Sequence, residues 1–203
     1  MFLFNYLKNE LKYILLKLNW KKLNKHNFTT IGKGTYGKLN IKTFGSKKES
    51  LKIGNYVSIA AIVTFILGGN HYYKTLSTHP FKKNFNIDES LSKELIIVED
   101  YIWIGNDVLV LSVVKLGKCS VIAARSVVTK DIEPYSIVTG NPCKIIKYRF
   151  EEDIIKALNE IDFNLIDKFF FINNKKLMYS KIDIEVIEKN KKRAYKKMMV
   201  LYL

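Results

Sequence analysis

The segment from Val98 to Gly140 repeats with a period of six residues. One phase of the repeat is aliphatic without interruption, at Val98, Ile104, Val110, Leu116, Ile122 and Val128. A period of six matches neither the 3.6-residue turn of an α-helix nor the alternation of a β-strand. It is typical of a hexapeptide β-solenoid, in which each six-residue step forms one face of a triangular prism and points one aliphatic side chain inward. A mainly β fold is therefore predicted.

An earlier stretch continues the repeat toward the amino terminus. Its inward anchors are Ile31, Ile53, Ile59 and Phe65. The next position of the phase is His71, where the repeat stops. Residues 71–96 contain Pro80 and follow no six-residue phase before the repeat resumes. Long loops that interrupt a regular fold are usually functional, so this excursion is the predicted binding loop of a solenoid domain over 28–148.

Composition limits the remaining possibilities. The chain has 203 residues and a net charge of +15, which suits one domain with appendages and an anionic partner or surface. Its two cysteines show no metal-ligand spacing and fit a reducing cytoplasm. No apolar run reaches the roughly 20 residues of a membrane span, and no nucleic-acid-binding module accompanies the basic charge. We therefore expect a cytoplasmic protein that binds no nucleic acid and no metal.

Helical segments are expected at both ends. Residues 1–27 predict a basic amphipathic helix with an apolar stripe at Leu3, Leu7, Leu11, Ile14 and Leu18. This helix could rest peripherally on the inner face of an anionic membrane, or it could pack on the solenoid or across an oligomer interface. Residues 149–203 predict a basic helical tail that begins with acidic residues.

His71 is the best placed of three histidines to do chemistry. It follows Gly68-Gly69-Asn70, whose glycines let the backbone turn sharply out of the solenoid. A histidine fixed at the base of a loop is suited to act as a general base near neutral pH. The alternative is a structural histidine whose ring bonds a carbonyl group. His79 is a weaker candidate within the same loop, and His26 is expected to be structural.

Three motifs taken together carry a resemblance to a known family. These motifs are the runs GGNHYYKTLSTHPF, IWIG and ARSVVTKDIEPYSIVTGNPCKIIKYRF. Together they resemble the hexapeptide-repeat acetyltransferases. Within that family, they resemble the subgroup of chloramphenicol, streptogramin and capsular or lipopolysaccharide O-acetyltransferases. The resemblance covers about residues 28–150. It implies a left-handed parallel β-helix that forms a homotrimer, binds acetyl-CoA in a cleft between neighbouring coils and uses His71 as general base.

The resemblance also implies the coenzyme contacts. Trp103 would lie beside the pantetheine and acetyl end. The other candidates include basic side chains that could bind the coenzyme phosphates. They are Ala123, Arg125, Ser126, Thr129, Lys130, Lys144, Lys147 and Arg149. Three sites depart from the family pattern. Arg125 and Thr139 stand where glycine is usual, and Ser112-Val113-Val114 replaces the usual Pro-Gly-Val.

The predicted function is acetyl-CoA-dependent O-acetylation of a sugar in a bacterial capsular or surface polysaccharide, at a site between trimer subunits. Alternatives are N-acetylation of a nucleotide-linked amino sugar and O-acetylation of chloramphenicol or streptogramin drugs. The same type of solenoid also carries zinc carbonic anhydrases, but these need three histidines that meet across a subunit interface. A purely structural scaffold is disfavoured by the GG-x-H motif and the intact IWIG coil.

Overall fold

The computed structural model describes residues 28–71, 73–74, 76–79, 95–163, 172, 174–175 and 179–188. The predicted amino-terminal helix over 1–27 and residues 80–94 of the excursion lie outside the described residues. The chain divides after Arg149 into two compact units, which we describe separately.

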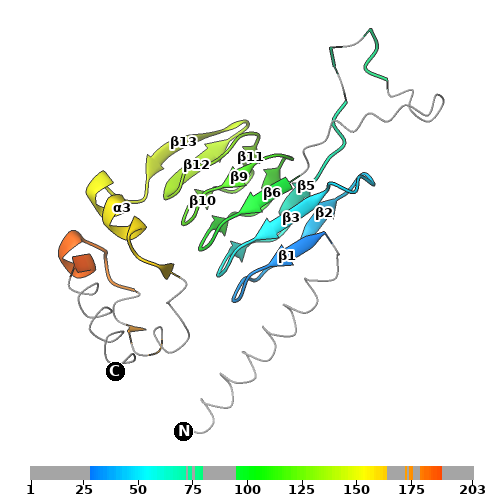
Figure 1. The fold of residues 1–203 in the computed structure, drawn as a ribbon. Helices are drawn as coiled ribbons and strands as arrows, with labels where there is room; N and C mark the ends of the chain where they lie inside the picture. Colours follow the sequence, from blue (N-terminus) through cyan, green and yellow to red (C-terminus); the bar gives the residue numbers. More distant parts are fainter. Residues whose placement is uncertain are drawn as a thin grey trace, which may run out of the picture. The chain divides into compact units, whose positions relative to one another are not determined.

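The first unit is a three-sided solenoid of parallel strands (Figure 1). The first sheet contains β1 (Thr29–Ile31), β3 (Ser50–Ile53), β6 (Leu95–Val98) and β9 (Lys115–Leu116). The second contains β4 (Ser58–Ile59), β7 (Trp103–Ile104), β10 (Val121–Ile122), β12 (Ser136–Gly140) and β13 (Cys143–Tyr148). The third contains β2 (Asn40–Lys42), β5 (Thr64–Ile66), β8 (Leu109–Val110) and β11 (Val127–Val128). The chain visits the sheets in this order, so each full turn is one coil.

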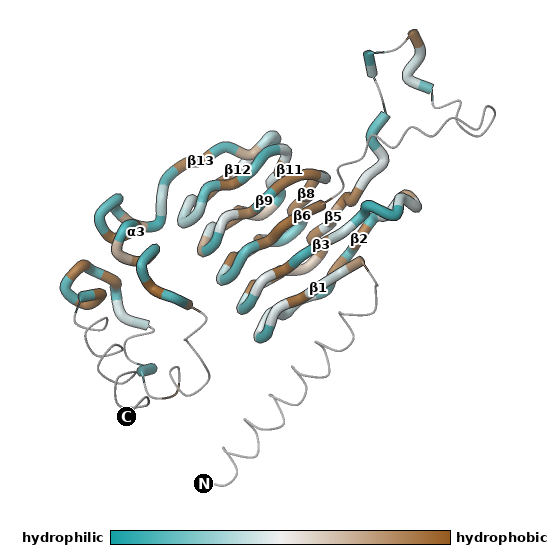
Figure 2. The backbone as a smooth tube through the Cα atoms, viewed as in Figure 1, coloured by the Kyte–Doolittle hydropathy of each residue, from teal (hydrophilic) through white to brown (hydrophobic). Residues whose placement is uncertain are grey.

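The core is a set of aliphatic columns inside the prism. Strand register stacks each predicted anchor on its counterpart in the next coil, as in the pairs Ile53 with Val98 and Ile104 with Ile122. Phe65 pairs with Val110 in the third sheet, and both are fully buried. Burying such a side chain stabilises a fold by about 1.5–3 kcal/mol. The six-residue phase is thus confirmed, with hydrophilic segments gathered at many of the turns (Figure 2).

The last coil departs from the strict period. The phase after Val128 points to Pro134, yet Pro134 is exposed and Ile132 takes the inward place by pairing with Leu116. The last coil is therefore shorter by two residues. Strand β12 then turns back at Gly140, whose φ is +104°, and continues as β13 antiparallel to it. The sequence pattern did not predict this closing hairpin.

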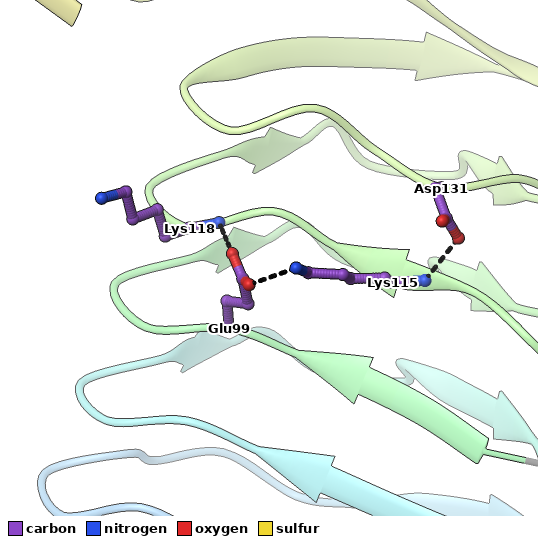
Figure 3. A network of polar contacts seen from close by, with 4 residues as sticks. All are labelled: Glu99, Lys115, Lys118 and Asp131. Atoms are coloured by element: carbon purple, nitrogen blue, oxygen red, sulfur yellow. Dashed lines mark hydrogen bonds and ion pairs between the residues drawn. The ribbon is translucent and has the colours of Figure 1, made fainter. Parts of the chain in front are cut away.

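Polar side chains join the later coils. The Nζ atom of Lys115 lies 2.6 Å from Oε1 of Glu99, and the backbone amide of Lys118 donates to Oε2 of the same carboxylate at 2.8 Å (Figure 3). The amide of Lys115 donates to Oδ1 of Asp131 in the last coil, also at 2.8 Å. The Glu99 contact raises the pKa of the Lys115 ammonium. Glu99 therefore balances the charge of Lys115, and Glu99 and Asp131 both accept hydrogen bonds from backbone amides of a neighbouring coil.

Non-glycine residues in left-handed backbone conformation mark the corners. Tyr56, Tyr101 and Cys119 occupy successive corners between the first and second sheets with φ of +53° to +59°. Arg125 adopts φ of +60° between the second and third sheets, a conformation in which glycine avoids the strain that a side chain meets. The left-handed winding of the whole solenoid stays a prediction.

The second unit begins with the α-helix α3 (Glu152–Asn159). Its first turn holds Glu152 and Asp153, which favour a helix amino terminus. Lys156 pairs with Glu152 at 2.6 Å one turn along. Residues 184–188 are also helical, and the rest of the predicted tail stays a prediction. Among the described residues, no helix combines the length and apolar character that crossing a membrane requires.

Candidate active site

The excursion leaves the solenoid at the corner between the third sheet and the first sheet of the next coil, which we call the loop corner. It follows β5 and precedes β6 (Figure 1). Gly69 lies there with φ of +82°, and a Cβ atom at this position would lie 2.7 Å from the ring of Phe44. Phe44 belongs to the corresponding turn one coil earlier. Glycine here avoids both the backbone strain and a clash that would displace the ring.

A hydrogen bond fixes the next residue to the following coil. The Nδ2 atom of Asn70 donates to Oγ of Ser112 at 3.0 Å. Ser112 lies at the loop corner one coil later, between β8 and β9. The residues just before His71 are thus held from both sides, by Phe44 below and Ser112 above. Sequence reasoning did not identify Asn70, Ser112 or Phe44 as supports, although the Ser112 segment stood out as a departure from the family pattern.

His71 is exposed, and one ring nitrogen has a defined partner. Its Nδ1 atom lies 2.8 Å from the carbonyl oxygen of Thr78. A carbonyl oxygen only accepts hydrogen bonds, so in the neutral ring Nδ1 carries the proton and Nε2 keeps its lone pair. The ring does bond a carbonyl, as the structural alternative expects. That carbonyl belongs to the excursion itself, however, and the contact orients Nε2 as a proton acceptor.

The second described histidine of the excursion is His79. His79 is exposed, and its backbone amide donates to Oγ of Ser77 at 3.1 Å. Within the described part of the chain, no group of three or more His, Cys, Asp or Glu side chains gathers in a way that could hold a metal ion.

Trp103 lies on a different side of the prism from His71. It belongs to β7 in the second sheet, where 58% of the residue is exposed. Its neighbours across the sheet are Ser58 and Val121. The second sheet is the face opposite the loop corner, because that corner joins the other two sheets. One subunit therefore does not bring Trp103 and His71 together.

Two predicted coenzyme residues share the loop corner with His71. Thr129 and Lys130 are exposed and follow β11, two coils beyond the excursion. Ser112 lies at the same corner between them. The structure thus aligns hydroxyl groups and one ammonium group along the prism edge that carries His71.

Ser126 differs from the other predicted coenzyme residues in being buried, and its coenzyme contact stays a prediction. It is fully buried, and its Oγ atom donates to the carbonyl oxygen of Ala123 at 2.7 Å. The hydroxyl group stabilises the corner and does not face solvent. Ala123 is half-buried at the same corner, beside the exposed Arg125. The guanidinium of Arg125 lies 3.5 Å from the carboxylate of Asp107 one coil earlier, so part of its charge is balanced there.

The remaining basic candidates do not form one cluster with Lys130. Lys144 and Lys147 are exposed on β13 of the second sheet. Arg149 follows that strand, and its Nη1 atom donates to the carbonyl oxygen of Cys119 at 2.7 Å. Its backbone amide also donates to the carbonyl oxygen of Tyr135 at 2.8 Å. Arg149 thus joins the end of β13 to the corner between the first and second sheets.

Known proteins resemble this chain over part of its length. A chloramphenicol acetyltransferase of Klebsiella aerogenes is 37% identical over 123 residues, which cover 56% of this chain and 59% of that protein. A protein named probable macrolide acetyltransferase from Lysinibacillus sphaericus is 36% identical over 123 residues, which cover 56% of this chain and 68% of that protein. This chain belongs to the same acetyltransferase family. The predicted enzyme class, an acyltransferase, is confirmed at the level of the family.

This chain spans 57 to 59% of the length of three chloramphenicol acetyltransferases that it matches. Among solved structures, a hexapeptide-repeat acetyltransferase of Vibrio cholerae in complex with acetyl coenzyme A has 26% identity and a TM-score of 0.48, with 62% of each chain covered. A maltose O-acetyltransferase of Clostridium difficile has 27% identity and a TM-score of 0.45, covering 62% of this chain and 61% of that one. No family model matches this chain.

Proposed function

We propose that this protein transfers the acetyl group of acetyl-CoA to a hydroxyl group of its acceptor, with His71 as general base. The observation that carries the proposal is the Nδ1 contact of His71 with the Thr78 carbonyl at 2.8 Å, which leaves Nε2 as the proton acceptor on an exposed ring. The reaction needs such a base and no nucleophile on the protein.

The chemistry follows from the position of Nε2. An acceptor hydroxyl held against Nε2 loses its proton as its oxygen attacks the thioester carbonyl carbon of acetyl-CoA. The carbon–sulfur bond then breaks, the acetyl ester forms, and the imidazolium returns the proton to the leaving thiolate. Fixing both reactants beside one ring makes the step effectively intramolecular. A positioned general base of this kind accelerates a reaction by about 10²–10⁴-fold.

The same proposal places acetyl-CoA along the prism edge that carries His71. The acetyl end would lie at the loop corner beside His71, and the phosphates would lie toward Thr129 and Lys130 two coils further on. Lys130 supplies the positive charge that a coenzyme phosphate requires, and the Thr129 hydroxyl supplies a donor. Lys144 and Lys147 remain candidates for a coenzyme held by a neighbouring subunit.

We further propose a homotrimer with its sites between subunits. Trp103 lies on the face opposite His71, so both residues can line one site only if they come from two copies of the chain. Mixing His71→Ala and Trp103→Ala subunits tests this arrangement. In a random mixture, about one quarter of shared sites regain both residues and activity reappears. No recovery from two inactive parents would contradict a shared site.

For the acceptor, we propose a sugar hydroxyl of a capsular or surface polysaccharide. The net charge of +15 supports an anionic polymer as acceptor. The 37% identity to a chloramphenicol acetyltransferase favours a second candidate, O-acetylation of a drug hydroxyl. Purified protein should be incubated with acetyl-CoA and with surface polysaccharides, chloramphenicol, a macrolide and an amino-sugar nucleotide, while thiol release is measured. Release with the drugs alone would replace the polysaccharide proposal, and release with the nucleotide alone would indicate N-acetylation.

A further inference from the structure

Charge is distributed unevenly along the solenoid. Residues 28–66, which form the first two coils, contain six lysines and one glutamate, a net charge of +5. Residues 95–149, which form the later coils and the closing hairpin, contain seven basic and five acidic residues, a net charge of +2. The lysines of the early coils are Lys33, Lys38, Lys42, Lys47, Lys48 and Lys52, and all six are exposed. We call residues 28–66, which carry these lysines, the basic end of the solenoid.

The single carboxylate of the basic end does not balance these lysines at the surface. Glu49 is 5% exposed. Its Oε1 atom accepts hydrogen bonds from the backbone amides of Phe44 at 2.7 Å and Ser46 at 3.4 Å. The carboxylate thus organises the turn over residues 43–49 from inside. Lys47 and Lys48 are exposed in that turn, and the exposed Lys42 immediately precedes it.

A large aromatic side chain is exposed next to three of these lysines in the sequence. Phe44 is 60% exposed in the turn that Glu49 organises, between Lys42 and the pair Lys47 and Lys48. Exposed aromatic rings beside lysines are the combination that an anionic bilayer surface attracts, because the rings enter the interface while the ammonium groups meet lipid phosphates. The described residues of the basic end contain no arginine, the side chain that dominates recognition of nucleic-acid phosphates.

We infer that the basic end of the solenoid is a docking surface for an anionic phospholipid membrane. Phe44 is the apolar contact, and the neighbouring lysines supply the electrostatic attraction. Phe44 also lies against Gly69 at the base of the excursion, so this docking surface adjoins the loop corner. It makes binding dependent on the charge of the lipid and on salt, since the attraction falls off within a Debye length.

The test is co-sedimentation of the full chain with phosphatidylcholine vesicles, with and without about 30% phosphatidylglycerol. The variant Lys42→Gln/Lys47→Gln/Lys48→Gln removes three charges of the basic end. Because each lysine near an anionic surface contributes about fivefold, this variant should lose about 100-fold in partition coefficient. The control Lys118→Gln/Lys130→Gln/Lys144→Gln makes the same change of net charge in the last coils, and it should lose less than tenfold.

A second variant separates lipid from soluble polyanions. Phe44→Ala should weaken binding to anionic vesicles by about tenfold, because the ring no longer enters the interface. It should leave binding to duplex DNA or an acidic polysaccharide unchanged. Equal binding of the wild type to both kinds of vesicle would overturn the inference. Equal losses of vesicle binding in the two triple-lysine variants would also overturn it. So would tighter binding to a soluble polyanion than to vesicles, combined with unchanged vesicle binding by Phe44→Ala.

Discussion

The side chains of Asn70 and Ser112 join across 42 residues of sequence through one hydrogen bond of 3.0 Å. Asn70 immediately precedes His71, and Ser112 lies at the same corner of the next coil. The contact attaches the base of a long excursion to the rigid part of the solenoid. A general base needs a fixed position, so this bond is expected to act on the rate of the reaction more than on stability.

Loss of this bond should reduce turnover. We expect Asn70→Ala to lower kcat by about 10–100-fold, because a displacement near 1 Å at a reacting group has an effect of that size. The matched control is Asn40→Ala, which removes a 2.8 Å bond to Oγ1 of Thr64 on the third sheet. Both variants should lose similar stability, measured by thermal unfolding, but only Asn70→Ala should lose kcat. Equal activities would show that the Asn70 bond does not position His71.

Gly69 and Gly45 allow a second matched comparison. Both have positive φ, +82° and +90°, but a Cβ atom on Gly69 would strike the Phe44 ring whereas one on Gly45 would meet nothing within 4 Å. Alanine at either position costs about 1–2 kcal/mol in backbone strain. Only Gly69→Ala should also displace the loop base and lower acetyl transfer severalfold or more. Comparable activity in the two variants would contradict a role for the Phe44 contact.

The inward columns predict a clear contrast in stability. Ile104 is fully buried, and Ile104→Val should reduce the free energy of unfolding by about 0.5–1.5 kcal/mol. Ile146 on β13 is 59% exposed, and Ile146→Val should change it by less than about 0.5 kcal/mol. Denaturant unfolding of the two variants measures the difference. A larger loss in Ile146→Val would place the hydrophobic core elsewhere.

The two cysteines should react slowly with thiol reagents. Burial raises the pKa of the Cys119 thiol, although nearby Arg149 and Lys118 lower it in part. Burial likewise raises the pKa of Cys143, which is only half-buried. A raised pKa leaves less thiolate at neutral pH, and thiolate is the reactive form. With a disulfide reagent, we expect slow labelling of Cys143, and labelling of Cys119 only after unfolding. Rapid labelling of Cys119 in the native protein would contradict its buried position.

The repeat made the solenoid predictable from sequence, because a period of six has one simple structural explanation. It located the inward anchors through Val128 and the exit at His71. It did not reveal the shorter last coil, since Ile132 and Pro134 are both compatible with a buried position until the pairing with Leu116 is known. The hairpin of β12 and β13 was missed because it follows no six-residue phase.

The site was less predictable than the fold. The GG-x-H motif identified His71, but its partner is the carbonyl group of Thr78, and backbone carbonyls leave no mark in a sequence. The burial of Ser126 was not predicted, because a serine in the repeat can point to either side of a corner, and here its hydroxyl donates to the Ala123 carbonyl. The basic residues near the end of the repeat lie close in sequence, yet the turn at Gly140 distributes them over different sheets and corners.

The central claim is that Nε2 of His71 accepts the proton of the acceptor hydroxyl. The direct test is the rate of acetyl transfer by His71→Asn, with His79→Asn as the matched control. The asparagine amide nitrogen can still donate to the Thr78 carbonyl as Nδ1 does, but the side chain lacks the basic nitrogen. We expect His71→Asn to lose about 10²–10⁴-fold in rate and His79→Asn to stay near the wild type. A His71→Asn enzyme within about tenfold of the wild-type rate would contradict the general-base role.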